Sequence, residues 1–247
     1  NRIKGAENIP EKINNIIKAY RLDKPENSVD SLVDLYKTIQ QLPIKTNWVY
    51  KKLEEVKQLI IGCSGLFFEA TTDDEYAVLG ERMNINFFVN KRKDANIQWE
   101  SVWVKNTFDT VTHTTLALNQ NNSFIKSVLV DVKTKVSQPY WLSKSQENIG
   151  SFSVDDQLQI GQDESAAAYV ANFSFKINGI NFVDQKPVQY KYVDPVKGEL
   201  YQPLVVITPI IVSLTPDNVL SNIVSNNKQI ASPTLHLQYK EIGRAHV

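Results

Sequence analysis

The N-terminal part of the chain repeats apolar positions every three to four residues, which is the spacing of amphipathic helices. The first stripe begins at a potential capping residue, Asn8, and ends near Tyr20. A second stripe runs from Ser28 to Leu42 between two prolines, and a third runs from Asn47 to Gly62. The pattern therefore predicts a short helical cap over residues 1–62.

After Gly65 the apolar positions alternate with polar ones, as in Met83–Val89, and this alternation is typical of strands. Short runs of this kind are separated by polar turns. The clearest hairpin signal is Asn178-Gly179, because a type I′ turn needs a positive φ at both central residues. No helical pattern joins one strand to the next, so a parallel sheet is disfavoured. We therefore expect a mainly β protein, with an antiparallel Ig-like β-sandwich over residues 63–198.

The C-terminal part predicts a further boundary and a foreign tail. The turn-forming segment Asp194–Glu199 and the prolines after it indicate that residues 199–240 are the truncated start of a second β module. The end of the chain, 241–247, reads like the in-frame translation of a sequencing adapter, so we expect these residues to be no part of the native fold. Because Asn1 is not a methionine and no signal segment follows it, we expect the chain to be an internal fragment of a larger protein.

Composition excludes some classes of partner. Lysine plus arginine equals aspartate plus glutamate at 27 each, so the sequence has no electrostatic footprint for nucleic acid, and we expect no such partner. The longest apolar stretch, Leu204–Leu214, is interrupted by polar residues and is too short to cross a bilayer as a helix. A single cysteine, Cys63, cannot form an internal disulfide.

The residues that usually carry catalysis do not cluster in the sequence. The three histidines, His113, His236 and His246, show no metal-ligand spacing, and the first two alternate with strand residues. The acidic runs Asp73–Glu75 and Asp155–Asp156 are interpreted as solvated loops, although the second is also compatible with a calcium site between strands. No phosphate-binding loop or nucleophile elbow occurs. We therefore predict no catalytic residue and no metal ligand in this chain.

Aromatic residues offer one candidate binding site. Tyr140 and Trp141 follow a proline and could stack on the apolar faces of sugar rings, so they are the predicted sugar-binding residues. Trp99 and Trp103 lie an even number of residues apart, which in a regular strand places both on the core face. A carbohydrate-binding β-sandwich module is accordingly an alternative function for the chain.

Several ordered motifs resemble one protein family. From Asn1 to about Thr215, the chain resembles the region downstream of the catalytic domain in long bacterial members of the PIG-L (LmbE-like) deacetylase family. The resemblance rests on the number and order of scaffold motifs rather than on chemical ones. These motifs are Asn1-Arg-Ile-Lys-Gly5, Asp23-Lys-Pro-Glu-Asn-Ser28, Cys63-Ser-Gly-Leu66, Gln138-Pro-Tyr-Trp-Leu142 and Tyr192-Val-Asp-Pro-Val-Lys-Gly-Glu199.

The resemblance implies a parent protein that removes acetyl groups from N-acetylglucosamine-type sugars by means of zinc-activated water. The family's His-Pro-Asp-Asp-Glu motif is absent, and Thr72–Glu75 shares only its acidic letters, so no active-site residue is transferred and zinc is expected only in an upstream catalytic domain. The function implied is a non-catalytic accessory region whose partner is that domain, with glycans as a further possible ligand. The resemblance also implies a secreted or periplasmic location, which the residues themselves do not indicate.

Overall fold

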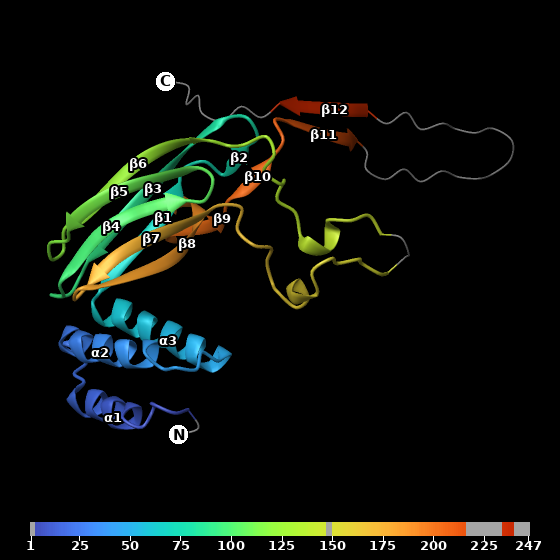
Figure 1. Ribbon diagram of the computed structural model, residues 1–247. Helices are drawn as coiled ribbons and strands as arrows, with labels where there is room; N and C mark the ends of the chain where they lie inside the picture. The colour runs from blue at the N-terminus through green and yellow to red at the C-terminus, as the bar shows by residue number, and fades with distance from the viewer. Residues whose placement is uncertain (1–2, 147–149, 216–233, 240–247) are drawn as a thin grey trace, which may run out of the picture. The chain divides into compact units, whose positions relative to one another are not determined.

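The computed structural model describes residues 3–146, 150–215 and 234–239 (Figure 1). The chain divides into two compact units. The first unit comprises Asn1–Thr71, Ile85–Lys126 and Tyr169–Val188, and the second comprises Thr72–Asn84, Ser127–Ala168 and Gln189–Val247. The suspected adapter tail, 241–247, lies outside the described residues.

The predicted helical segment is confirmed. Thr46 caps the third helix, because its hydroxyl accepts a hydrogen bond from the N–H of Val49 at 3.4 Å. Asn8 precedes the first helix as expected but makes no side-chain capping hydrogen bond. The helices are α1 (Ile9–Ala19), η1 (Pro25–Ser28), α2 (Val29–Gln40), α3 (Asn47–Cys63), η2 (Tyr140–Leu142) and η3 (Gln157–Gln159).

The rest of the described chain is mainly β, also as predicted. An eight-stranded sheet has the order β5-β4-β7-β8-β1-β3-β6, with β9 paired to β8, and two smaller sheets pair β10 with β2 and β11 with β12. The strands are β1 (Leu66–Thr72), β2 (Tyr76–Val78), β3 (Arg82–Lys91), β4 (Ile97–Val104), β5 (Phe108–Thr115), β6 (Asn121–Leu129), β7 (Val170–Ile177), β8 (Ile180–Asp194), β9 (Gly198–Pro203), β10 (Val205–Ile207), β11 (Ile210–Thr215) and β12 (Thr234–Tyr239).

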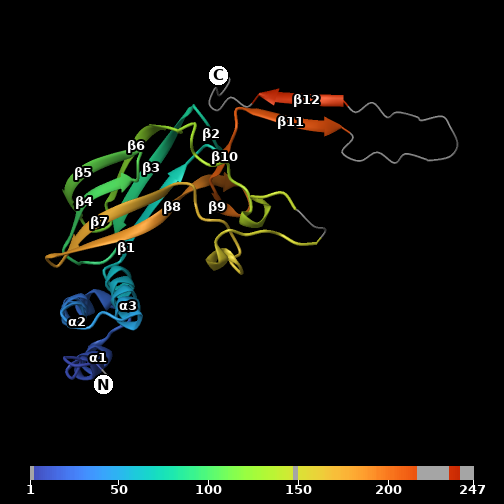
Figure 2. The same ribbon diagram turned by 45° about the vertical axis from the view of Figure 1, so that its right-hand side comes forward.

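Within the first unit, the large sheet curls around an aromatic core into a nearly closed barrel (Figure 2). Phe124 on the edge strand β6 stacks on Trp99 of β4 at a centroid distance of 5.6 Å. Phe108 on the opposite edge strand, β5, contacts Phe87 of β3 at 5.2 Å. Both edges thus pack against the same interior. The expected sandwich of two packed sheets is corrected to one sheet that curls into a nearly closed barrel, because one core is shared by both of its edges.

A β-bulge overturns the expectation that both tryptophans of β4 face the core. The pairing of β4 with β5 and with β7 shifts register between Trp99 and Ser101. The extra residue inverts the alternation after it, so Val102 and Val104 are buried while Trp103 lies half-buried on the opposite face. Trp99 itself is only 2% exposed.

The Asn178-Gly179 hairpin is confirmed. These residues have φ of +44° and +84° and join β7 to β8 through a ladder that starts at Ile177 and Ile180. The Asn178 amide also donates to the carboxylate of Asp30 on α2. The hairpin turn is therefore one of the points where the helical segment meets the sheet.

Helices α2 and α3 are anchored to β8 within the first unit. Tyr36 of α2 meets Phe182 edge to face at 5.0 Å. Lys57 of α3 donates to the carbonyl of Val183 at 3.1 Å and forms an ion pair with Asp184 at 2.9 Å, with only 13% and 12% of the two side chains exposed. The helices and the sheet therefore form one packed body rather than a detached cap.

The anchor leads to a pH-dependent prediction. Burial alone lowers the pKa of Lys57, but hydrogen bonds to Glu54 and Asp184 outweigh it and raise this pKa above its ordinary value of 10.5. Because the folded-state pKa is the higher one, the stabilisation is complete below the unfolded-state pKa and is lost as the pH rises through the folded-state pKa. We expect Lys57→Met to lower the free energy of unfolding by about 1.5–3 kcal/mol at neutral pH. In urea titrations, the difference in free energy of unfolding between wild type and Lys57→Met should become smaller above roughly pH 10.5. A difference that stays constant with pH would contradict the ion pair.

The second unit contains the shorter β elements. Strand β10 runs parallel to β2, and the N–H of Gly80 donates to the carbonyl of Val130 at 2.9 Å. The predicted boundary segment forms the turn between β8 and β9, where the Asp194 carboxylate accepts from the N–H groups of Val196 and Lys197 at 2.8 and 2.7 Å. In the part of the chain that the structure describes, no helix has the length and apolar character needed to cross a membrane.

Candidate functional site

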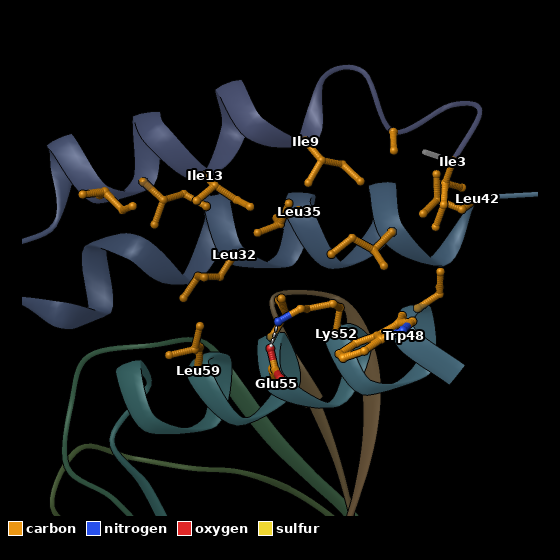
Figure 3. Close-up of a pocket in the computed structure, with 16 residues that line it drawn as sticks. Ile3, Ile9, Ile13, Leu32, Leu35, Leu42, Trp48, Lys52, Glu55 and Leu59 are labelled. Atoms are coloured by element: carbon orange, nitrogen blue, oxygen red, sulfur yellow. Dashed lines mark hydrogen bonds and ion pairs between the residues drawn. The ribbon is translucent and has the colours of Figure 1, made fainter. Parts of the chain in front are cut away.

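An apolar groove lies in the helical segment of the first unit (Figure 3). Helix α1 packs along α2, and α2 packs along α3, so α2 forms the floor of the groove and the other two helices form its walls. The cavity has a volume of about 530 Å³, within the range of pockets that bind small molecules. The residues that line it include Ile13 and Ile17 of α1, Leu35 and Ile39 of α2, and Trp48 and Leu59 of α3.

The groove is open because its apolar side chains are left exposed. The apolar residues of α1 lie on one face, yet none of them is buried. Ile17 is 67% exposed, and on the facing wall Trp48 and Leu59 are 69% and 53% exposed. Large apolar side chains of this exposure, gathered on one surface, are typical of a binding site rather than of an ordinary solvated face.

The charged groups around the groove compensate one another. Lys12 of α1 forms an ion pair with Asp34 of α2, which ties the wall to the floor. On the other wall, Lys52 and Glu55 pair at 2.6 Å across one turn of α3. Exposed pairs of this kind contribute little stability, so binding in the groove would rest on apolar contact and shape.

The predicted sugar-binding residues lie in the second unit, on η2. Tyr140 and Trp141 are half-buried, and their rings meet edge to face at 4.8 Å with an interplanar angle of 88°. The Tyr140 hydroxyl donates to the carbonyl of Gln162 at 3.4 Å and accepts from the N–H of Gly161 at 3.3 Å. The two perpendicular rings therefore do not form one flat surface, and their role in sugar binding stays a prediction.

The acidic runs and histidines do not converge. Burial raises the pKa of Asp74, and repulsion from the Asp73 carboxylate adds to this effect. A hydrogen bond from the backbone of Asn84 lowers the same pKa and only partly offsets the rise. Asp155 pairs with Lys144, and Asp156 caps η3. Among the described residues, no three His, Cys, Asp or Glu side chains lie close enough to share a metal ion.

Of the three histidines, only one has a described side-chain partner. His113 places Nδ1 2.6 Å from a carboxylate oxygen of Glu100 beside the bulge in β4. His236 lies exposed on β12, and His246 is outside the described residues. The groove itself was missed at the sequence level, because an apolar stripe on a helix indicates a contact face without showing whether anything covers it.

Comparisons with known proteins identify no family for this chain. No family model matches the chain, and no curated protein matches it. One solved structure with a detectable likeness is the Pseudomonas fluorescens alkylpurine DNA glycosylase AlkC bound to DNA containing an abasic site analog, at 8% sequence identity and a TM-score of 0.22. The likeness covers 69% of this chain and 48% of the glycosylase, so the chain spans about half of that protein's length. A TM-score this low carries no argument about function.

Proposed function

We propose that this chain is a non-catalytic accessory region of a PIG-L-like zinc-dependent N-acetylglucosamine-type deacetylase, and that its helical groove holds the upstream catalytic domain. The ordered scaffold motifs support the family. The observation that carries the docking role is the open apolar groove formed by α1, α2 and α3. No step of the zinc chemistry is assigned to this chain, because the family's His-Pro-Asp-Asp-Glu motif does not occur in its sequence.

The position of the groove along the chain supports an occupant from the preceding domain. Ile3 and Ala6 line the groove together with the first helix. A domain joined just before these residues would be tethered beside its docking surface, at an effective concentration in the millimolar range for a short linker. Even a modest apolar contact would then hold the two parts together.

The test measures binding between this chain and the separately produced upstream domain of the parent protein. We expect Ile17→Asp to weaken binding by about tenfold or more, because a carboxylate would lose water on entering the apolar interface. Leu22→Asp is the matched control, since Leu22 is 84% exposed and does not line the groove, so it should bind like wild type. Circular dichroism checks that both variants keep their helices.

Three results would overturn the proposal. The first is an upstream reading frame that encodes no PIG-L zinc motif. The second is equal affinity of wild type and Ile17→Asp for the upstream domain. The third is deacetylase activity in the isolated chain, because the proposal places all of the chemistry upstream.

A further inference from the structure

The β-bulge in β4 is fixed by several side chains. The Trp99 indole N–H donates to the carbonyl of Ser101 at 3.2 Å, and the Thr112 hydroxyl donates to the carbonyl of Trp99 at 2.7 Å. His113 pairs with Glu100 and has φ of +43°, a left-handed conformation that is uncommon for residues other than glycine. Bulges and residues held in strained conformations of this kind concentrate at functional sites.

The consequence of the bulge is a polar and aromatic row on the outer face of the sheet. Trp103 lies opposite Asp109 of β5 on one side and opposite Asn172 of β7 on the other. Asn172 in turn lies opposite Gln185 of β8. The row therefore places a carboxylate, an indole and two amides side by side on four neighbouring strands, over about 14 Å at the usual strand spacing.

The amides of the row are held in place. The Gln185 side chain donates to the amide oxygen of Asn172 at 2.9 Å, and Asn172 donates to the backbone carbonyl of Trp103 at 3.4 Å. Asn172 is only 8% exposed, whereas Asp109 and Gln185 are exposed. The buried amide thus orients an exposed one, and the exposed groups at the two ends of the row are available to a ligand.

We propose that the row Asp109–Trp103–Asn172–Gln185 is a binding site for neutral glycans built of pyranose rings. A pyranose ring has an apolar C–H face that packs on an indole, and hydroxyl groups around its rim. A carboxylate accepts hydrogen bonds from those hydroxyls, and an amide both donates and accepts. A flat ring flanked by such groups is the arrangement that orients a polar ligand on an apolar contact. This site is separate from the helical groove and does not depend on the docking role.

Calorimetric titration of the complete chain tests the proposal with three probes: cellohexaose, maltohexaose and the hexamer of N-acetylglucosamine. Wild type should bind at least one of them, and Trp103→Ala should weaken that binding by about tenfold or more, the size of loss typical of a central aromatic contact. Asp109→Asn should weaken it by about three- to tenfold. Val111→Ala is the matched control, because Val111 is 66% exposed, lies on β5 like Asp109, and is outside the row.

The outcomes separate this row from the other aromatic pair. A wild-type chain that binds none of the three probes, or a Trp103→Ala variant that binds as tightly as wild type, overturns the proposal. Loss of binding in Trp141→Ala with no change in Trp103→Ala overturns it as well and moves the site to η2. If circular dichroism shows that Trp103→Ala does not fold, Asp109→Asn decides, and an unchanged dissociation constant in that variant rules the row out.

Discussion

Replacing Phe173 with alanine is expected to lower the free energy of unfolding by about 3–5 kcal/mol. Phe173 is fully buried at the centre of the curled sheet. Its ring lies 5.0 Å from that of Phe68, 6.1 Å from that of Phe87 and 6.3 Å from that of Trp99. These neighbours belong to three different strands, so they cannot collapse together into the space that the ring leaves, and a cavity remains.

Urea denaturation followed by circular dichroism measures this effect. Phe152→Ala is the matched control, because Phe152 is 49% exposed, and its replacement should change the free energy of unfolding by less than about 0.5 kcal/mol. A loss below about 1.5 kcal/mol in Phe173→Ala would show that the interior repacks, which contradicts a sheet curled around one tightly packed aromatic core.

Two glycines near the end of α3 should respond to alanine in opposite directions. Gly65 has φ of +63°, and an added Cβ would lie 2.8 Å from the backbone nitrogen of Lys93. Backbone strain and the clash together are expected to destabilise Gly65→Ala by about 2–4 kcal/mol. Gly62 lies inside the helix, and beyond the neighbouring helix backbone no atom lies within 4 Å of an added Cβ, so Gly62→Ala should stabilise the protein by about 0.5–1 kcal/mol.

Thermal and urea unfolding of the two variants test this pair directly. The comparison is well matched, because the same methyl group is added a few residues away on the same chain segment. Gly65 lies against the turn at Lys93, where the Arg92 N–H donates to the Gly65 carbonyl at 2.8 Å. A Gly65→Ala variant as stable as wild type would mean that this contact leaves room for a methyl group, which contradicts the structure.

The sequence predicted what is set by local spacing. The three helices follow from apolar residues at three- and four-residue intervals, and the β7–β8 hairpin follows from the demand of a type I′ turn for Asn178-Gly179. Closure of the sheet was not predictable in this way, because strands of a sandwich and of a curled sheet alternate alike. Their difference depends on which residues distant in the sequence, such as Phe124 and Trp99, meet in space.

The outward position of Trp103 and the open groove were not predicted from the sequence, for related reasons. An even spacing places Trp99 and Trp103 on one face only if the strand is regular, and the bulge between them depends on bonds from Thr112 on another strand. Likewise, the stripe on α1 predicted an amphipathic helix, but the 67% exposure of Ile17 depends on what packs against α1 in the folded chain. Local patterns identify surfaces, and tertiary packing decides whether they are covered.

The sequence separation between β7 and the strands it pairs with also affects how fast the protein folds. Strand β7 is joined to β8 by a two-residue turn, whereas its other neighbour, β4, pairs residue 97 with residue 177. A local hairpin forms within about 1–10 μs, but a ladder between distant segments must first overcome the entropy of closing a long loop. We therefore expect the hairpin to form early and the ladders between distant segments, β4–β7 among them, to limit the folding rate. Lengthening the connection between β6 and β7 should slow folding while changing the free energy of unfolding by only about 0.6 kcal/mol per doubling.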